Sequence, residues 1–219
     1  MTDGALTLGV RLSEAQTKAL HTYLVHLKRW NLKVNLTGLK GDEEIIEKHF
    51  LDSLGGVVLL PPWEEGYGAE VLDIGSGAGF PGLVFKIVRP DLSLSLLEPT
   101  GKKAAFLHHI IGQLKLKDIR VISRRLEALG PETGPFDLCV SRALASPRKL
   151  LDRCRPLIKE DGRVILYEGR PRGLPSSPAD TTFPNTNNSR AISKWSREAF
   201  VYRLPFSGIF REIGVYNRS

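Results

Sequence analysis

A glycine-rich stretch near residue 75 offers the clearest chemistry in this 219-residue chain. Asp73 ends a short apolar run, and Gly75, Gly77 and Gly79 follow it at two-residue intervals. The apolar segment 83–88 comes next, so the order is a strand, a tight turn and the start of a helix. This arrangement lets the main chain approach a nucleotide-like cofactor closely. Glycines suit it because a Cβ atom would hinder turns with positive φ and block the contact.

Two kinds of cofactor fit this stretch. Residues 77–82 match the pattern GxGxxG, which is the dinucleotide fingerprint. Residues 73–79 form the pattern acid-x-G-x-G-x-G, which resembles motif I of the S-adenosylmethionine-dependent methyltransferases. S-adenosylmethionine has no phosphate, so it needs close main-chain approach and an acid near its ammonium group, which Asp73 would supply. Glu98 ends the next predicted strand, where its carboxylate can accept both ribose hydroxyls of either cofactor.

From residue 70 onward the sequence alternates between strand and helix patterns. Strands are expected at 70–74, 93–97, 119–123, 136–140 and 163–167, and helices at 81–88, 102–114, 125–129 and 147–158. This alternation predicts a parallel sheet with helices on both faces. Two more strands are expected at 199–204 and 208–215, with too few residues between them for a parallel crossover.

The predicted fold class is therefore α/β, with a Rossmann-like, seven-stranded and mostly parallel sheet that ends in an antiparallel C-terminal strand. That ending resembles the class I methyltransferase sheet and differs from the all-parallel sheet of dehydrogenases.

The N-terminal part of the chain has helical patterns instead. Ser13 begins a capping-box sequence, and apolar residues then recur at helical spacing up to Trp30. A second helix is expected over 42–54, where His49 and Asp52 lie three residues apart and share a face. A turn-rich connector follows. We predict a helical N-terminal region, 1–66, packed on a cofactor-binding core, 67–219.

The overall charge favours a polyanionic partner. The chain has 31 Lys and Arg against 24 Asp and Glu, a net charge of +7, which favours nucleic acid before membrane. No apolar run approaches the ~20 residues needed to span a bilayer. Cys139 and Cys154 cannot form a disulfide framework or a metal site alone. We expect a cytoplasmic, monomeric protein that binds no metal, and we interpret His108 and His109 as structural.

Longer runs of sequence point to one family. Asn35-Leu36-Thr37, the run from His49 to Leu54, the run from Asp73 to Gly82, the run from Lys102 to Leu107, and Ser141-Arg142-Ala143 occur in the order typical of that family. Together they resemble the bacterial ribosomal RNA small-subunit methyltransferase G family, also called glucose-inhibited division protein B, over about residues 10–170. The resemblance implies methyl transfer from S-adenosylmethionine to N7 of a guanine in 16S ribosomal RNA.

The resemblance also implies which residues contact the cofactor. They come from the glycine loop, from the ends of the second and third strands and from the residue after the fourth strand: Gly75, Gly77, Phe80, Glu98, Pro99, Thr100, Leu126, Glu127 and Arg142. The partner would be 16S ribosomal RNA or the small ribosomal subunit. Two features depart from the family: Glu168-Gly169 stands where Lys-Gly is usual, and 170–188, a Pro-, Ser-, Thr- and Asn-rich segment that reads as a long loop, matches nothing.

Guanine N7 carries a lone pair and no proton, so in-line attack on a sulfonium methyl group needs no general base. Catalysis should then consist mostly of alignment and desolvation. We expect Asn35 and Arg142 to position the base and its phosphates, and His49 and Asp52 to brace the N-terminal helices against the core.

Other functions are compatible with parts of the sequence. The literal GxGxxG match would suit an NAD-dependent oxidoreductase. A methyltransferase acting on a protein or a small molecule would share the same cofactor loop. A non-catalytic RNA-binding ribosome-assembly protein could retain the cofactor pocket as a relic.

Overall fold

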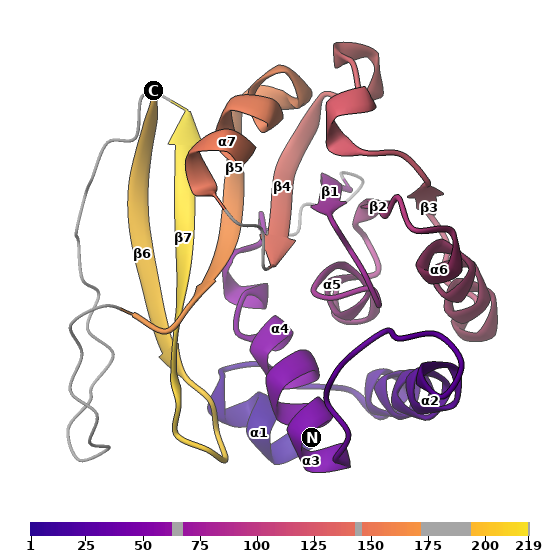
Figure 1. The fold of residues 1–219 in the computed structure, drawn as a ribbon. Coiled ribbons are helices and arrows are strands. Elements are labelled where there is room, and N and C mark those ends of the chain that lie inside the picture. The colour runs from indigo at the N-terminus through magenta and orange to yellow at the C-terminus, as the bar shows by residue number, and fades with distance from the viewer. Residues whose placement is uncertain (63–67, 143–145, 172–193, 219) are drawn as a thin grey trace.

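A seven-stranded sheet with the order β3-β2-β1-β4-β5-β7-β6 runs through the middle of the molecule (Figure 1). The computed structural model describes residues 1–62, 68–142, 146–171 and 194–218. The strands are β1 (Glu70–Ile74), β2 (Ser93–Leu97), β3 (Ile119–Ile122), β4 (Phe136–Arg142), β5 (Ile158–Gly169), β6 (Trp195–Arg203) and β7 (Phe210–Arg218).

Strands β1 to β5 pair in parallel, and β7 pairs antiparallel with both β5 and β6. The predicted fold class is thus confirmed, including its antiparallel ending. The strand order reverses between β1 and β4, because β2 and β3 lie on one side of β1 and the later strands lie on the other. In open α/β sheets, ligands bind beside such a switch point, at the carboxyl ends of the strands.

Helices cover both faces of the sheet (Figure 1). They are α1 (Thr2–Thr7), α2 (Glu14–Asn31), α3 (Asp42–Ile45), α4 (Asp52–Leu54), α5 (Gly82–Val88), α6 (Gly101–Leu114) and α7 (Pro147–Cys154). On one face, α2 packs against α5 and α6, while α7 packs against β5. Neighbouring residues of β1 pack on opposite faces of the sheet. Val71 belongs to one hydrophobic cluster, and Leu72 and Ile74 belong to the other.

The N-terminal region contributes to the same hydrophobic cluster as the core. The capping box at Ser13 is present, and Tyr23 and Phe50 are fully buried together with Phe85 of α5. The predicted division at residue 66 stays a prediction, because residues 63–67 lie outside the described part of the chain.

The second predicted helix is not a continuous α-helix. Residues Ile46–Leu51 form a π-helical segment, η1, between α3 and α4. Such segments insert an extra residue into a turn and frequently occur at functional sites. The sequence pattern could not predict this segment, nor the short helix α1.

Several element boundaries also differ from the predictions. Helix α7 ends at Cys154, followed by a 3-10 turn over Arg155–Leu157, because Pro156 has no N–H with which to continue the helix. Strand β5 accordingly starts at Ile158, earlier than expected. The helix expected at 125–129 is only the 3-10 turn Leu126–Ala128. Most of the segment predicted as a loop, 170–188, lies outside the described residues.

Candidate functional site

The carboxyl ends of β1, β2 and β4 bring the predicted site residues to one edge of the sheet. Ile74 of β1 pairs with Leu97 of β2 and with Ser141 of β4. The residues that follow these three positions are Gly75, Glu98 and Arg142. The glycine loop, the acid and the arginine therefore meet at the switch point of the sheet.

The glycine loop adopts a main-chain conformation that explains its composition. Gly75, Gly77 and Gly79 have φ angles of +72°, +58° and +96°, a region that favours glycine. A Cβ atom on Gly82 would come within 2.6 Å of the Asp73 carboxylate, so this glycine lets the start of α5 close over the acid. The spacing seen in the sequence is thus a requirement of both turn geometry and close packing.

Glu98 holds the loop in place from the neighbouring strand. Its Oε2 accepts a hydrogen bond from the Gly77 N–H at 2.9 Å, and its Oε1 accepts one from the Thr100 N–H at 2.8 Å. Each carboxylate oxygen keeps a further lone pair, so the residue can also accept ribose hydroxyls. That ribose contact stays a prediction.

Asp73 lies beneath the loop, and one of its two carboxylate oxygens accepts a hydrogen bond. Its Oδ2 accepts a hydrogen bond from the Gly82 N–H at 3.0 Å, while Oδ1 is buried and has no hydrogen-bond partner among the described residues. The nearby Ser76 hydroxyl donates to the Asp73 main-chain carbonyl at 2.9 Å. Burial raises the pKa of Asp73 to about 7. A buried acceptor of this kind fits a cofactor that brings a cationic donor, as S-adenosylmethionine does.

Arg142 points from the end of β4 toward the N-terminal helices. Its Nη1 donates to the Lys48 carbonyl at 3.0 Å, and its Nη2 lies 2.7 Å from Nδ1 of His49. It also forms an ion pair with Asp52 at 3.5 Å and lies over the Phe80 ring, 5.2 Å from its centroid. The guanidinium is therefore oriented by several groups at once.

The Phe80 side chain belongs to the packing of the loop. Its ring is 3% exposed and stacks between Tyr23 at 5.1 Å and His49 at 4.7 Å, with Phe50 edge-on at 5.1 Å. The loop is thereby anchored to both N-terminal helical segments. A contact between Phe80 and the cofactor stays a prediction.

His49 and Asp52 tie the N-terminal region to the sheet, as expected for braces. Asp52 accepts a hydrogen bond from the Tyr202 hydroxyl at 2.8 Å and pairs with Arg211 at 3.2 Å, although the Arg211 Nε–H is not directed well enough for a hydrogen bond. Burial raises the pKa of Asp52, and the two arginines oppose that shift. Tyr202 and Arg211 come from β6 and β7, too distant in sequence for any pattern to link them to this site.

The remaining predicted residues lie around the same edge. Asn35 is exposed in the loop between α2 and α3, Pro99 and Thr100 are exposed before α6, and half-buried Leu126 and exposed Glu127 follow β3. Their contacts with cofactor or RNA stay predictions.

Glu168, which departs from the family pattern, has partners on the C-terminal strands. It pairs with Arg197 at 2.6 Å and accepts a hydrogen bond from the Tyr216 hydroxyl. Arg197 also pairs with Glu212. The carboxylate at this position therefore contributes to joining β5, β6 and β7.

Of the two histidines of α6, His109 has the packed, hydrogen-bonded surroundings of a structural residue, and His108 is exposed. His109 Nε2 lies 2.8 Å from Nδ1 of His26 on α2, and its ring packs 5.0 Å from Trp30. Among the described residues, no group of three or more His, Cys, Asp or Glu side chains could hold a metal ion. Cys139 and Cys154 are buried and free.

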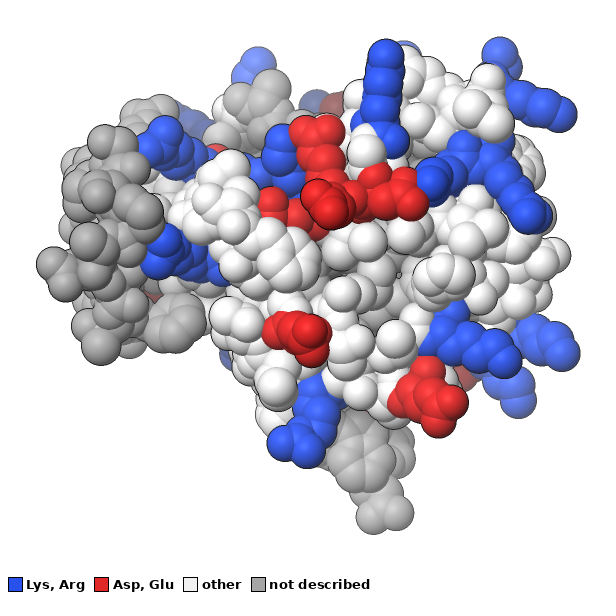
Figure 2. Space-filling view, turned by 90° about the horizontal axis from the view of Figure 1, so that it is seen from below, with Lys and Arg blue, Asp and Glu red and all other residues white. Residues whose placement is uncertain are grey.

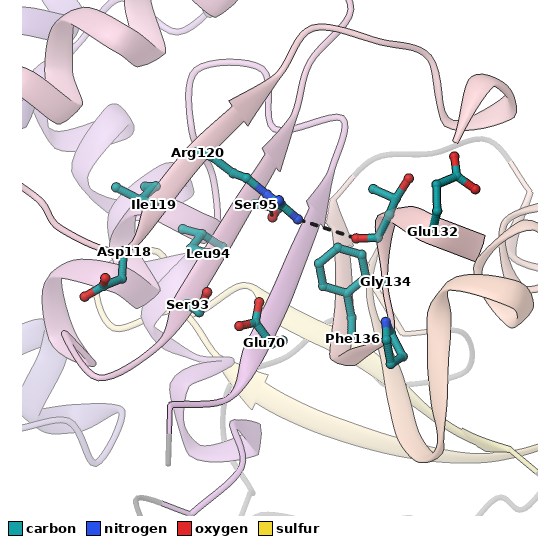
Figure 3. A pocket seen from close by; sticks show the side chains of 12 residues that line it. Glu70, Ser93, Leu94, Ser95, Asp118, Ile119, Arg120, Glu132, Gly134 and Phe136 are labelled. Atoms are coloured by element: carbon teal, nitrogen blue, oxygen red, sulfur yellow. Dashed lines mark hydrogen bonds between the residues drawn. The ribbon is translucent and has the colours of Figure 1, made fainter. Parts of the chain in front are cut away.

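A cavity of about 570 Å³ lies at the opposite edge of the sheet (Figure 3). It is lined by the first residues of four strands, Glu70, Ser93, Ile119 and Phe136. Arg120 donates there to the Ser95 hydroxyl at 2.8 Å. This cavity is separate from the glycine loop, because parallel strands place their two ends on opposite edges.

The face that carries the N-terminal helices has charges of both signs (Figure 2). Lys and Arg side chains lie mainly around its rim, and a group of Asp and Glu side chains lies nearer its middle. Lys28 pairs with Asp42 there, and Lys48 pairs with Glu44 at 2.5 Å. Part of the basic charge on this region is thus neutralised locally.

Comparison with known proteins identifies the family. The family model described as rRNA small subunit methyltransferase G (GidB) matches residues 16–173. The chain belongs to the rRNA small subunit methyltransferase G family. The methyltransferase G of Acetivibrio thermocellus is 35% identical over 222 residues, which cover 99% of this chain and 86% of that protein. That of Roseiflexus sp. is 41% identical over 164 residues, which cover 74% and 68% of the two chains.

Solved structures show the same fold at low sequence identity. The Burkholderia thailandensis 1,6-didemethyltoxoflavin-N1-methyltransferase, solved with S-adenosylhomocysteine, has a TM-score of 0.56 at 13% identity and covers 91% of this chain and 90% of its own. A mutant of MtNAS has a TM-score of 0.57 at 14% identity, covering 94% and 75%. Membership of the methyltransferase G family agrees with the class I fold. It confirms the predicted enzyme class and the predicted cofactor, S-adenosylmethionine. The alternative of an NAD-dependent oxidoreductase is therefore excluded.

Proposed function

We propose that this enzyme methylates N7 of a guanine in 16S ribosomal RNA, with S-adenosylmethionine as donor and without a general base. The buried Oδ1 of Asp73 beneath the glycine loop, which has no hydrogen-bond partner in the described part of the chain, carries the cofactor part of this proposal. When bound, S-adenosylmethionine supplies an electrophilic methyl group on a sulfonium centre. Asp73, Glu98 and the main chain of the glycine loop would hold it.

The residues near the edge suit a positioning role better than proton transfer. His49 has both ring nitrogens engaged, and its pKa is lowered to about 3 by burial and by the Arg142 charge. N7 has no proton to release, so a base would have nothing to remove. Arg142 and the exposed Asn35 would orient the guanine and its phosphates.

The direct test is nucleoside mass spectrometry of 16S ribosomal RNA from a strain that lacks the gene. We expect 7-methylguanosine to disappear and to return when the wild-type gene is restored, while other methylated nucleosides stay constant as internal controls. Unchanged 7-methylguanosine, or loss of a different methylguanosine, would contradict the proposal.

The form of the substrate needs a separate assay. We expect purified enzyme to methylate RNA or small subunits isolated from the deletion strain and to leave wild-type subunits unmodified. We further propose that it acts as a monomer in the cytoplasm. Sedimentation of the enzyme at assay concentration should give a mass near the 24.3 kDa of one chain.

A further inference from the structure

A chain of hydrogen bonds connects an exposed loop of the N-terminal region to Arg142. The Thr37 hydroxyl lies 2.7 Å from Nε2 of His49, and Nδ1 of the same ring lies 2.7 Å from Nη2 of Arg142. The loop end of this chain is itself fixed, because Asn31 Oδ1 accepts a hydrogen bond from the Thr37 N–H at 2.9 Å. One imidazole therefore bridges the loop and the sheet edge.

The direction of each hydrogen bond follows from the chemistry of the groups. A guanidinium can only donate, so Nδ1 of His49 must accept from Arg142. A neutral imidazole has a single N–H, which is then on Nε2 and donates to the Thr37 hydroxyl oxygen. Arg142 thus selects the tautomer, and the Thr37 hydroxyl satisfies the N–H that this tautomer carries on Nε2. With the other tautomer, an N–H of His49 would face an N–H of Arg142.

Packing fixes the plane of the imidazole as well. The ring stacks on Phe80 with an interplanar angle of 16°. Phe80 directly follows the glycine loop. Asp52, the first residue of α4, forms an ion pair with the Arg142 guanidinium. The orientation of Arg142 is thereby linked to the cofactor loop and to the N-terminal helices together.

We propose that His49 is a positioning residue for methyl transfer: it holds Arg142 in its working orientation and couples it to the 32–41 loop. This inference rests on the proposed function. The same loop carries Asn35, Lys33 and Lys40, all exposed and suited to contact RNA. RNA bound to the loop would act on Arg142 through Thr37 and His49.

The test is a double-mutant cycle with His49→Phe and Arg142→Ala. Phenylalanine keeps the ring stacked on Phe80 but removes both hydrogen bonds. Loss of one hydrogen bond to a charged group predicts a roughly 10–100-fold lower kcat/KM with small subunits as substrate. If His49 acts through Arg142, His49→Phe should have almost no further effect in the Arg142→Ala background. Full additivity of the two effects would overturn the proposal.

Conservative variants separate positioning from folding. His49→Gln can still accept from Arg142 and donate to Thr37, so it should recover most of the activity that His49→Phe loses. Thr37→Val should reproduce part of the loss, and His109→Phe, a matched histidine change between α2 and α6, should leave kcat/KM within about twofold. A Gln variant as impaired as the Phe variant, at equal thermal stability, would contradict the inference.

The tautomer of His49 can also be measured by NMR spectroscopy, without an activity assay. Nitrogen-15 NMR of the histidine ring should show wild-type His49 as the neutral Nε2–H tautomer, and Arg142→Ala, which removes the donor to Nδ1, should shift the signals toward the other tautomer. A wild-type ring with its proton on Nδ1 would overturn the proposal. An enzyme with the expected tautomer that fails to methylate ribosomal RNA would contradict the proposed function alone.

Discussion

The buried carboxyl of Asp73 lowers the stability of the fold at neutral pH, and we expect a bound cofactor to offset that loss. Its carboxyl is fully buried, one oxygen has no partner among the described residues, and burial raises its pKa to about 7. In the unfolded chain the same carboxyl ionises near pH 4. Between these values the folded state binds a proton that the unfolded state lacks, so this group's contribution to stability decreases as the pH rises toward 7. A cationic ligand would reverse this penalty by pairing with the charged form.

We expect the wild-type enzyme to bind S-adenosylhomocysteine more tightly as the pH rises through about 7, because only ionised Asp73 attracts the ammonium group. Asp73→Asn should remove this pH dependence and weaken binding roughly 10–100-fold at pH 8, the value of one hydrogen bond between charged groups. Calorimetric titration from pH 6 to 8 measures both effects.

Denaturant unfolding of Asp73→Asn measures how this carboxyl changes the free energy of unfolding. Asp73→Asn should lack the decrease in unfolding free energy that Asp73 contributes between about pH 4 and 7. Asp118→Asn, at an exposed acid on the opposite edge of the sheet, is the matched control and should behave like wild type. Equal cofactor affinity in the two variants would show that Asp73 does not contact the ligand.

At the scale of elements, the glycine loop and helix α2 depend on each other. The Tyr23 hydroxyl on α2 donates to the Ala78 carbonyl in the loop, and its ring stacks on Phe80. Gly79 lies between Ala78 and Phe80 and packs closely against both α2 and α5. A Cβ atom on Gly79 would come within 2.7 Å of the Tyr23 hydroxyl on α2 and within 2.3 Å of Leu83 on α5. The N-terminal region thus shapes the cofactor loop directly.

Gly79→Ala should therefore destabilise the fold by roughly 2–4 kcal/mol, from strain at a φ of +96° and from overpacking. Gly101→Ala, at the first residue of α6, is the control, because nothing lies within 4 Å of its added methyl group. We expect that change to be neutral or to stabilise by up to about 1 kcal/mol. Comparable unfolding midpoints for the two variants would show that the loop can relax away from α2.

At the scale of the whole molecule, the net charge of +7 does not make the face with the N-terminal helices uniformly basic. The face with the N-terminal helices mixes both signs (Figure 2), and Lys28 and Lys48 there are already paired. Exposed basic residues near the cofactor edge include Lys33, Lys40 and Lys102. RNA binding should therefore rely on a limited number of phosphate contacts beside this edge. Within the described part of the chain, no helix has both the length and the apolar character needed to cross a membrane.

Affinity for 16S ribosomal RNA should fall roughly twentyfold between 50 and 200 mM salt, as expected if about three phosphates are neutralised. Affinity for S-adenosylhomocysteine, measured in the same buffers, should change little and serves as the control. Filter binding or fluorescence anisotropy gives both curves. A flat salt dependence for RNA would mean that base and shape contacts dominate recognition.

The local sequence determined the strands and helices of the α/β sheet, its antiparallel ending and the cofactor loop, because these depend on short-range patterns. Apolar runs separated by helical segments require a parallel sheet, and Gly75, Gly77 and Gly79 are needed wherever φ is positive. The acid–glycine spacing predicted the cofactor, and five short runs in a typical order, including the run from His49 to Leu54, predicted the family. Short-range patterns also predicted that His49 and Asp52 share a face.

Only the tertiary structure decided what those side chains contact. Arg142 meets His49 across 93 positions of sequence, and Tyr202 meets Asp52 across 150. Glu168 finds Arg197 only after the C-terminal strands have paired. The π-helical segment Ile46–Leu51 is likewise visible only in the structure. The side-chain contacts arise from long-range packing, which places polar groups in buried positions where each must find a partner that no local pattern records.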